Sequence, residues 1–445
     1  MKKSQTTWQM DDLKVYPPLN ENIMADVVIV GAGITGITTA YLLAKEGRNV
    51  VVVDKGDLNE TVSAYTTAFI TYVVDTQFVD LINMFGREKA IQVFESKRRA
   101  IDLIEKNMRE CNFTCEFKRV PMYSFGTDEK QASDLKEDAE EACKGGFPLK
   151  EIEGVKLPFP NFGGIETPFQ AKFHPVQYLS CLKAKAHEKG VRFYDQTEVV
   201  RIEGEKTITV HTAKPGTNGK DATGPSIIAN NVVVATYKPM VEPGLTKLKK
   251  GTYITYVFEL SIPTETFPEA LYEDGENPYH YFRVDKGLGV TSSGKVDPSL
   301  DRLIIGGEDH RQEIPIDEDK NYSALEEYTK KILGDIPYTI VRRWNGPIIE
   351  PSDGLALIGR YDKKHPNHYS ATGFSGNGMT YGTLAGMMFA DMILGRKNEY
   401  EELYNPRRTH TLRSILYKGR DYTEELIHGA LKNSVRRTKS KGKTK

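Results

Sequence analysis

Near its amino terminus the chain reads Asp26-Val-Val-Ile-Val-Gly31-Ala-Gly33-Ile-Thr-Gly36, and soon afterwards Val50-Val-Val-Val-Asp54. The first stretch is an apolar run that ends in a glycine-rich turn, and the second is an apolar run that ends in an acid. Short apolar runs of this kind are typical of buried strands, and the residues between them fit a helix. This order predicts a parallel strand–helix–strand unit that binds a dinucleotide.

Each glycine of the turn has its own physical reason. Gly31 permits the tight turn off the strand, Gly33 lets the backbone approach a pyrophosphate, and Gly36 lets the helix pack close to the strand. The helix expected from Ile34 to Lys45 directs its free N–H groups and its positive dipole end at the phosphates. Asp54 is placed to accept hydrogen bonds from ribose hydroxyls. The alternative is an ordinary tight turn of an α/β domain that holds no nucleotide.

Length, charge and cysteine spacing exclude several classes of protein. A chain of 445 residues allows two or three ordinary domains, and its formal net charge of −1 excludes a molecule built as a whole to bind nucleic acid. No apolar run is long enough to cross a membrane, and residues 1–24 lack the apolar core of a signal peptide. The cysteine spacing fits neither a disulfide framework nor a zinc site, which indicates free thiols in a reducing, cytoplasmic compartment: Cys111, Cys115, Cys143 and Cys181.

Local patterns along the rest of the chain predict a mixed α/β protein. Helical spacing runs through 76–112 and 129–144, whereas Pro, Gly and Phe make 145–170 resemble a loop. A helix is expected from Pro175 to about Glu188, and the alternation from Thr252 to Val290 is typical of antiparallel strands. Shorter strands are expected at 191–194, 198–202, 207–212, 231–236, 303–307, 339–344, 355–359 and 368–372, and helices at 323–334 and 382–394.

A second glycine-rich segment reads Ala371-Thr-Gly-Phe-Ser-Gly-Asn-Gly-Met-Thr-Tyr-Gly382, about 340 residues after the first. One interpretation is a tight turn with glycines in left-handed conformations. The other is a turn that presses its backbone against a flat ring and aims a helix N-terminus at it, which stabilises the negative charge of a reduced flavin. NAD explains two such segments poorly. A single extended FAD explains both, with its phosphates at the first turn and its isoalloxazine near the second.

Together these motifs resemble the D-amino acid oxidase and glycine/sarcosine oxidase superfamily of FAD-dependent oxidoreductases. The resemblance covers roughly residues 25–405 and rests also on the stretches 63–68, 173–178, 232–236 and 344–359. The chain is most similar to a bacterial subgroup whose members often carry a C-terminal Rieske iron–sulfur domain. The cysteine–histidine pairs that such a cluster needs are not found in this sequence.

The resemblance implies an α/β fold with a discontinuous Rossmann-like FAD-binding domain and a substrate domain that contains a large antiparallel sheet. The FAD-binding domain would comprise 25–75, 170–240 and 350–400, and the substrate domain 76–169 and 241–349. An N-terminal arm, 1–24, and a C-terminal helical segment with a basic tail, 401–445, would flank them. The implied reaction is oxidation of a C–N bond in an amine or amino acid, with hydride passing to flavin N5 and then to oxygen or another carrier.

The resemblance also assigns contacts with the cofactor. Pyrophosphate would meet Gly31, Gly33, Ile34, Thr35 and Gly36, and ribose would meet Asp54 with Lys55 beside it. A loop that passes the phosphates and the ring would contribute Ala64, Thr66 and Thr67. The adenosine side would meet Val199, Ala235 and Thr236, and the flavin ring would meet Gly376, Asn377, Gly378, Met379 and Thr380.

Two departures from the family pattern bear on the chemistry. Amino-acid oxidases place an arginine that grips the substrate carboxylate where this chain has Ile348, within Gly346-Pro-Ile-Ile-Glu-Pro-Ser-Asp353. This argues against a simple α-amino acid as substrate, unless Arg283 or Arg343 takes that role. Many relatives carry a histidine where Tyr65 stands, and its replacement favours FAD held without a covalent bond.

The candidate catalytic residues are Tyr279, Tyr281, Arg283 and His310. Alternation along a strand would put Tyr279, Tyr281 and Arg283 on one face, where they suit a planar or cationic substrate over a flavin. The alternative is cross-strand packing with a surface arginine. His310 has the chemistry to exchange a proton near neutral pH, or it makes a structural hydrogen bond in a turn. We find no spacing typical of metal ligands in the sequence.

Three functions follow from these observations. The leading hypothesis is an FAD-dependent amine or amino-acid oxidase. The second is a flavoprotein dehydrogenase that passes electrons to a separate carrier, and the third is a non-catalytic FAD-binding scaffold. The basic tail from Lys432 onward is either solvated or in weak contact with an anionic surface.

Overall fold

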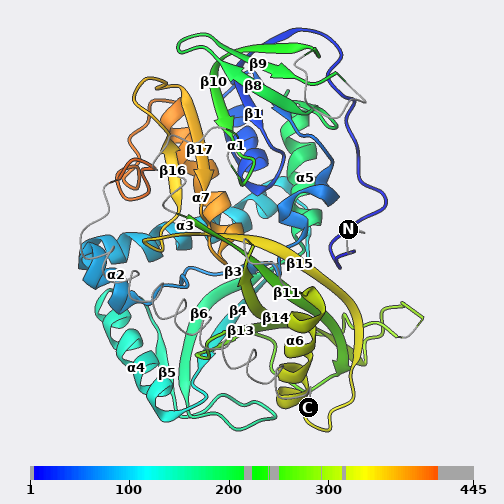
Figure 1. Ribbon diagram of the computed structural model, residues 1–445, viewed down its shortest axis with the longest axis vertical. Coiled ribbons are helices and arrows are strands. Elements are labelled where there is room, and N and C mark those ends of the chain that lie inside the picture. The colour runs from blue at the N-terminus through cyan, green and yellow to red at the C-terminus, as the bar shows by residue number, and fades with distance from the viewer. Residues whose placement is uncertain are drawn as a thin grey trace, which may run out of the picture.

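The computed structural model describes residues 5–214, 223–238, 240, 250–291, 293–312 and 317–408. Figure 1 shows two β-sheets, one above the other, with the long helix α3 (Arg87–Cys111) crossing between them. The predicted mixed α/β fold, with a Rossmann-like sheet and a second, largely antiparallel sheet, is confirmed. The basic tail and most of the expected C-terminal helical segment lie outside the described residues.

The first sheet has the strand order β16-β17-β10-β1-β2-β7. Its central strands run parallel, from β17 through β10, β1 and β2 to β7, while β16 and the β8–β9 hairpin are antiparallel additions. Valine-rich runs form its centre because both faces are covered. Its strands are β1 (Ile23–Val30), β2 (Val50–Val53), β7 (Arg192–Tyr194), β8 (Val199–Glu203), β9 (Ile208–Thr212), β10 (Ser226–Val234), β16 (Leu357–Arg360) and β17 (His368–Thr372).

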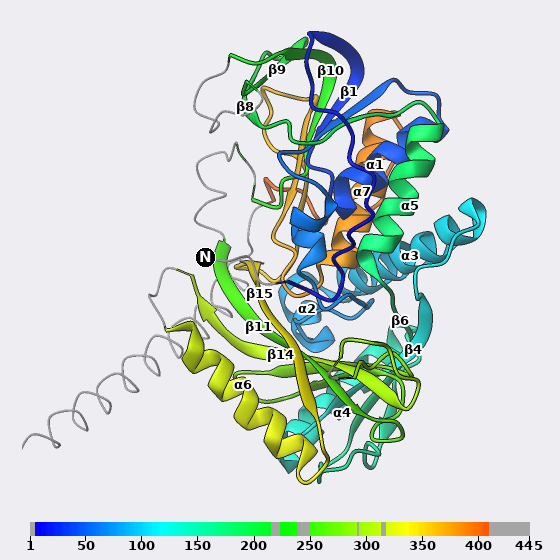
Figure 2. The same cartoon turned by 90° about the vertical axis from the view of Figure 1, so that its right-hand side faces the viewer.

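Helices α1 (Ile34–Lys45), α5 (Pro175–Glu188) and α7 (Gly378–Ile393) lie side by side against this sheet (Figure 2). Glycine lets α7 approach α1, because a Cβ atom on Gly382 would lie 2.4 Å from Cγ2 of Ile34 and one on Gly386 would lie 2.7 Å from Cβ of Thr38. The two helices that begin at the two glycine-rich turns are therefore neighbours.

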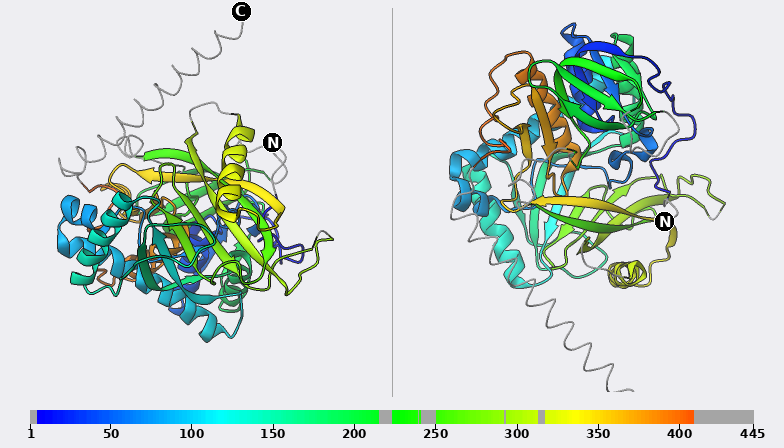
Figure 3. Two further views of the ribbon diagram at one scale, coloured as in Figure 1. Left: turned by 90° about the horizontal axis from the view of Figure 1, so that it is seen from below. Right: turned by 45° about the horizontal axis from the view of Figure 1, so that its top comes forward.

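The second sheet has the order β15-β11-β14-β13-β12-β4-β6-β3, with β5 paired to β6. All its pairs are antiparallel except β12 with β4. Figure 3 shows β11 and β15 as a long twisted pair at the boundary between the two halves. Its strands are β3 (Phe69–Ile70), β4 (Lys118–Phe125), β5 (Lys150–Ile152), β6 (Gly164–Lys172), β11 (Lys250–Pro263), β12 (Leu271–Asp274), β13 (His280–Asp285), β14 (Leu300–Arg311) and β15 (Thr339–Pro351).

The expectation of a loop over 145–170 is wrong at 150–152 and at 164–170, where β5 and the start of β6 form strands. Pairing with β4 on one side and β5 on the other outweighs the local loop composition, as is usual for strands. The remaining helices cover the second half: α2 (Phe78–Phe85), α4 (Glu129–Lys144) and α6 (Glu318–Leu333), the last lying along the outer face of β11 and β14 (Figure 2).

An extended N-terminal arm begins near the boundary between the two halves and runs along the first half to β1 (Figure 1). The backbone N–H groups of Tyr16 and Leu19 donate to Asp195 Oδ2 at 2.8 Å and Thr197 Oγ1 at 3.0 Å. Trp8, further back along the arm, is fully buried. The arm is therefore part of the folded core.

Candidate functional site

A cavity with a volume of about 660 Å³ extends from the first glycine-rich turn to the second and reaches the antiparallel sheet. Its wall includes most of the residues expected to contact a cofactor: Gly31, Gly33, Ile34, Thr35, Asp54, Lys55, Thr66, Thr67, Val199, Ala235, Thr236, Gly376, Asn377, Gly378 and Met379. Gly36, Ala64 and Thr380 are not part of this wall. The two segments that lie about 340 residues apart in sequence thus border one space.

The first turn is shaped by close backbone contacts. Gly31 has a φ of +109°, and a Cβ atom there would lie 2.5 Å from the carbonyl oxygen of Ala235. A Cβ atom on Gly36 would lie 1.9 Å from the carbonyl oxygen of Gly31, which explains why Gly36 serves packing and lies behind the wall. At Gly33 the nearest atom would be Ser63 Oγ at 3.1 Å, and the residue borders the cavity. Gly33 therefore presents backbone to the cavity, and a side chain there would also press against Ser63.

Asp54 closes the same end of the cavity. Its Oδ2 accepts a hydrogen bond from the Ala32 N–H at 2.6 Å, and its Oδ1 accepts one from the Gly56 N–H at 2.9 Å. Burial raises the pKa of this carboxyl group, and the two backbone hydrogen bonds oppose that shift. The carboxylate is held in a fixed place with lone pairs left for further donors.

The second turn is held by a polar cluster that runs from the exposed Asp75 to the buried side chains of Asn377 and Lys97. Asp75 accepts hydrogen bonds from the Gly376 N–H at 2.9 Å and from Asn377 Nδ2 at 2.5 Å. The Asn377 Oδ1 accepts from Thr71 Oγ1 at 3.2 Å and from the ammonium of Lys97. Because a lysine only donates, Lys97 fixes the orientation of the amide and turns its N–H₂ group toward Asp75.

The substrate-side wall comes from β4, β11, β12 and β13 and the residue before β13. It contains Met122, Thr255, Val257, Glu273, Tyr279 and Tyr281. The hydroxyl groups of Tyr281 and Thr255 lie 2.9 Å apart, and Tyr279 donates to Asp309 Oδ2 at 3.3 Å. Burial raises the pKa of both tyrosines, with the charge of Asp309 adding to the shift, so both stay protonated near neutral pH.

Comparison with known proteins identifies the family. The family model described as "FAD dependent oxidoreductase" (DAO) matches residues 26–392. The chain belongs to the DAO family of FAD-dependent oxidoreductases. It is 27% identical over 435 residues to the putative Rieske 2Fe-2S iron–sulfur protein YhfW of Bacillus subtilis. The alignment covers 96% of this chain and 81% of that protein. The chain is 21% identical to the gamma-glutamylputrescine oxidoreductase of Escherichia coli, covering 88% of each chain.

Solved structures of this family share the fold. The glycine oxidase of Geobacillus kaustophilus superposes with a TM-score of 0.67 at 17% identity, covering 87% of this chain and 99% of that one. Within the part of the chain that the structure describes, no helix has the length and apolar character needed to span a bilayer.

The cavity has the features that the DAO cofactor requires. A glycine cradle with room beside Gly33 lies at the N-terminus of α1, where backbone N–H groups and the helix dipole favour a pyrophosphate. Asp54 lies at the end of the second parallel strand, and a further helix N-terminus lies at the other end of the cavity. The residues present therefore fit FAD.

Arg283 lies outside the cavity wall, contrary to the expectation that it shares the substrate face with the two tyrosines. Its guanidinium group is buried and donates to the carbonyl oxygens of Thr67 and Ala68 at 3.1 and 3.0 Å, and to Asp285. It therefore supports the loop that borders the cavity. The other arginine considered, Arg343, pairs with Asp319 at 3.5 Å and is also not part of the wall.

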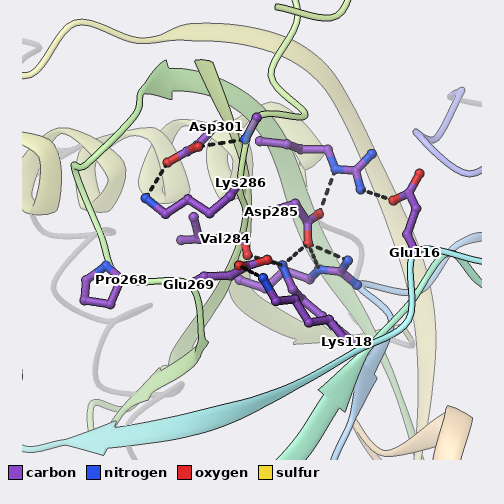
Figure 4. A network of polar contacts seen from close by, with 12 residues as sticks. Glu116, Lys118, Pro268, Glu269, Val284, Asp285, Lys286 and Asp301 are labelled. Atoms are coloured by element: carbon purple, nitrogen blue, oxygen red, sulfur yellow. Dashed lines mark hydrogen bonds and ion pairs between the residues drawn. The ribbon is translucent and has the colours of Figure 1, made fainter. Parts of the chain in front are cut away.

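Asp285 is the centre of the network that holds Arg283 (Figure 4). It accepts from Arg283, Arg302 and Lys172, at 2.7, 2.8 and 2.6 Å. Burial alone would raise the pKa of Asp285, but the charges of Arg283 and Arg302 hold it below its ordinary value. These cations are thus neutralised by the protein's own carboxylates.

His310 is also not among the wall residues. Its Nδ1 lies 3.2 Å from the hydroxyl of Tyr256, and the two rings are stacked. Burial lowers the pKa of His310. This arrangement matches the structural role considered for His310, although the residue lies in strand β14 and not in a turn.

The acids of the wall that sequence reasoning missed include Asp75 and Glu273, at its substrate end. Asp75 follows the short strand β3 in a segment without a motif, and Glu273 lies within β12 opposite Tyr281. The one available signal was an acidic residue inside the apolar stretch Ala270-Leu-Tyr-Glu, close in sequence to the two tyrosines.

Proposed function

We propose that the protein binds FAD in this cavity and oxidises the C–N bond of a small amine or amino acid. The observation that carries the proposal is the single cavity that joins both glycine-rich turns to the wall formed by β11, β12 and β13. The names of relatives support the substrate class, since one is named for gamma-glutamylputrescine and another for glycine.

The proposed contacts divide the cofactor between the two turns. Gly31, Gly33 and the N-terminus of α1 would hold the pyrophosphate, and Asp54 would accept from ribose hydroxyls. The turn at Gly376–Met379 would lie against the ring. When bound, FAD supplies the acceptor for the hydride that leaves the substrate carbon.

The chain's own side chains would orient the substrate and exclude water. Tyr279 and Tyr281 remain neutral, so they can exchange hydrogen bonds with an amine nitrogen without adding a charge. Phe69 and Val257 supply apolar surface to the same wall. In this arrangement the tyrosines position the substrate, and no residue of the protein needs to form a covalent bond with it.

The test is to purify the protein and record its absorbance spectrum, then add amines and amino acids without oxygen. We expect a yellow protein whose flavin absorbance bleaches with at least one amine. Peroxide on readmission of air would identify an oxidase, whereas reoxidation only by an added carrier would identify a dehydrogenase. A folded colourless protein, or a yellow one that no amine bleaches, would contradict the proposal.

A further inference from the structure

The substrate end of the cavity is lined by acids, and the ammonium of Lys97, which binds Asn377 beside Asp75, lies outside the described wall and has its pKa lowered by burial. Asp75 and Glu273 both line it, whereas no arginine is found among the described residues of the wall. The two lysines of the wall, Lys55 and Lys238, follow β2 and β10 at the nucleotide end. A substrate carboxylate placed near Asp75, which is exposed, and Glu273, which is half-buried, would meet like charges.

The position that could have supplied a cation is apolar. Ile348 of β15 lines the cavity, and only 6% of its surface is exposed. The nearby arginines Arg283 and Arg302 are both bound to Asp285. This part of the wall therefore offers no arginine to bind a substrate carboxylate, because Ile348 is apolar and the two arginines are bound to Asp285.

Both acids are fixed in place by hydrogen bonds that leave acceptor capacity free. Glu273 accepts from Ser124 Oγ at 2.7 Å. Asp75 is held by the backbone of Gly376 and by the amide of Asn377, whose orientation Lys97 sets. Burial raises the pKa of Glu273 to about 7, the bond from Ser124 opposes this, and the charge of Asp75 adds to it. The two carboxylates therefore repel each other, and a cation between them relieves that repulsion.

The nitrogen that is oxidised does not supply the positive charge that would neutralise Asp75 and Glu273. When the hydride leaves the carbon with its electron pair, the nitrogen lone pair forms the new C=N bond, so that nitrogen must be uncharged beforehand. A monoamine in its reactive form brings no positive charge to Asp75 and Glu273. A substrate with a second amino group does.

We infer that Asp75 and Glu273 bind a second ammonium group of the substrate, so that the protein prefers diamines or polyamines to monoamines and to amino acids. The inference rests on the proposed function, because it concerns the same cavity and the same C–N oxidation. It specifies that the substrate carries a second positive charge, and it names Asp75 and Glu273 as the residues that select such a substrate.

Binding can be measured apart from turnover. Holoenzyme reduced with dithionite and kept without oxygen cannot accept hydride, so calorimetric titration with 1,4-diaminobutane and with butylamine reports affinity alone. We expect the diamine to bind about tenfold more tightly or better, because charge-assisted hydrogen bonds to a carboxylate are the stronger kind. Equal affinity for the two amines, or tighter binding of N-methylglycine, would overturn the inference.

Glu273→Gln keeps the size of the side chain and its bond from Ser124 but removes the charge. We expect this variant to lose most of the preference for the diamine. The matched control is Glu276→Gln, because Glu276 is a neighbouring acid that pairs with Lys331 at 2.8 Å and is not part of the wall. Asp75→Asn provides a second test. A preference unchanged in both Glu273→Gln and Asp75→Asn would refute the role of these acids.

The experiment separates this inference from the proposed function. If diamines bind tightly but no amine bleaches the oxidised flavin, the proposed function fails while the binding site stands. If monoamines or amino acids bleach the flavin and diamines show no advantage, the proposed function stands and the inference fails.

Discussion

At the nucleotide end of the cavity a glycine turn brings backbone to the wall, whereas at the substrate end the wall is made by side chains from an antiparallel sheet. Gly31, Gly33 and the N-terminus of α1 form the part of the first wall proposed to hold pyrophosphate, with the Asp54 carboxylate beside them. Glu273 and Tyr281 on neighbouring strands form part of the second. A wall made of backbone requires glycine at a few neighbouring positions of the sequence. A wall made of side chains allows the residue at each position to differ according to the substrate.

The largest expected effect comes from breaking the backbone wall. Gly33→Val should abolish retention of FAD, because the protein has room beside Gly33 only where the pyrophosphate would lie. The measurement is the flavin absorbance per protein after purification, with circular dichroism to verify folding. The matched control is Gly154→Val, at an exposed residue whose Cβ would lie 3.7 Å from its nearest neighbour. A folded Gly33→Val protein that remains yellow would contradict this placement.

The next effect concerns Trp8, which connects the loop at Thr66 with the buried arginines of the second sheet. Its Nε1 donates to the carbonyl oxygen of Thr66 at 2.6 Å, and its ring lies 5.1 Å from the guanidinium groups of both Arg283 and Arg302. Trp8→Ala should lower the free energy of unfolding by about 3–5 kcal/mol, as for other buried tryptophans. Denaturant unfolding of the purified protein measures this.

A milder change at Trp8 provides the comparison. Trp8→Phe keeps an aromatic ring beside the arginines but loses the hydrogen bond to Thr66. Loss of this bond should lower the free energy of unfolding by about 1 kcal/mol, in addition to the effect of the smaller ring. If Trp8→Ala unfolds as readily as the wild type, the arm does not contribute to the core.

A third change would make the substrate wall resemble that of the amino-acid oxidases. Ile348→Arg should raise the ratio of flavin reduction by N-methylglycine to reduction by butylamine about tenfold, because it adds a donor pair for a carboxylate. Anaerobic stopped-flow measurements give both rates. Ile348→Leu should leave the ratio unchanged, and a ratio that does not move in the arginine variant would show that Ile348 lies away from the substrate.

The smallest expected effect is a pH dependence behind the substrate wall. His280 lies between Asp274 and Glu308, each 3.2 Å from a ring nitrogen. Although burial opposes it, these bonds raise the pKa of His280 from 6.5 to about 9. Since the folded value is the higher one, the stability gained from the proton is complete below about pH 6.5 and is lost as the pH rises to 9.

The gap in unfolding temperature between the wild type and His280→Gln should therefore be widest near pH 6 and narrow steadily toward pH 9. A gap that is constant over this range, or that widens with pH, would show that the ring is not protonated in the folded protein.

The contrast between the two walls also explains what the sequence could predict. The strand–helix–strand unit was visible because its apolar runs and glycines are contiguous and have one structural interpretation. The start of β6 was missed because it depends on pairing with β4 and β5, which its Pro- and Gly-rich surroundings do not reveal.

For the site, the glycine turns and Asp54 could be found from spacing alone. Arg283 was expected at the substrate because strand alternation gives the face of a side chain but not the place where its charged end binds, and here Asp285 and two carbonyl groups take it. Asp75 and Glu273 could not be found, because they meet only through the register of β12 and the packing of a loop against α7.

The burial of Trp8 also sets an order of events during synthesis. The arm leaves the ribosome first, yet its indole packs between Arg283 and Arg302, which emerge nearly 300 residues later. At about 5–20 residues per second, translation of that interval takes roughly 15–60 s. Throughout this time the residues against which Trp8 packs in the folded protein have not all been synthesised. Docking of the arm is therefore a late step, and a bulky fusion at the amino terminus should slow maturation more than one placed after Arg408.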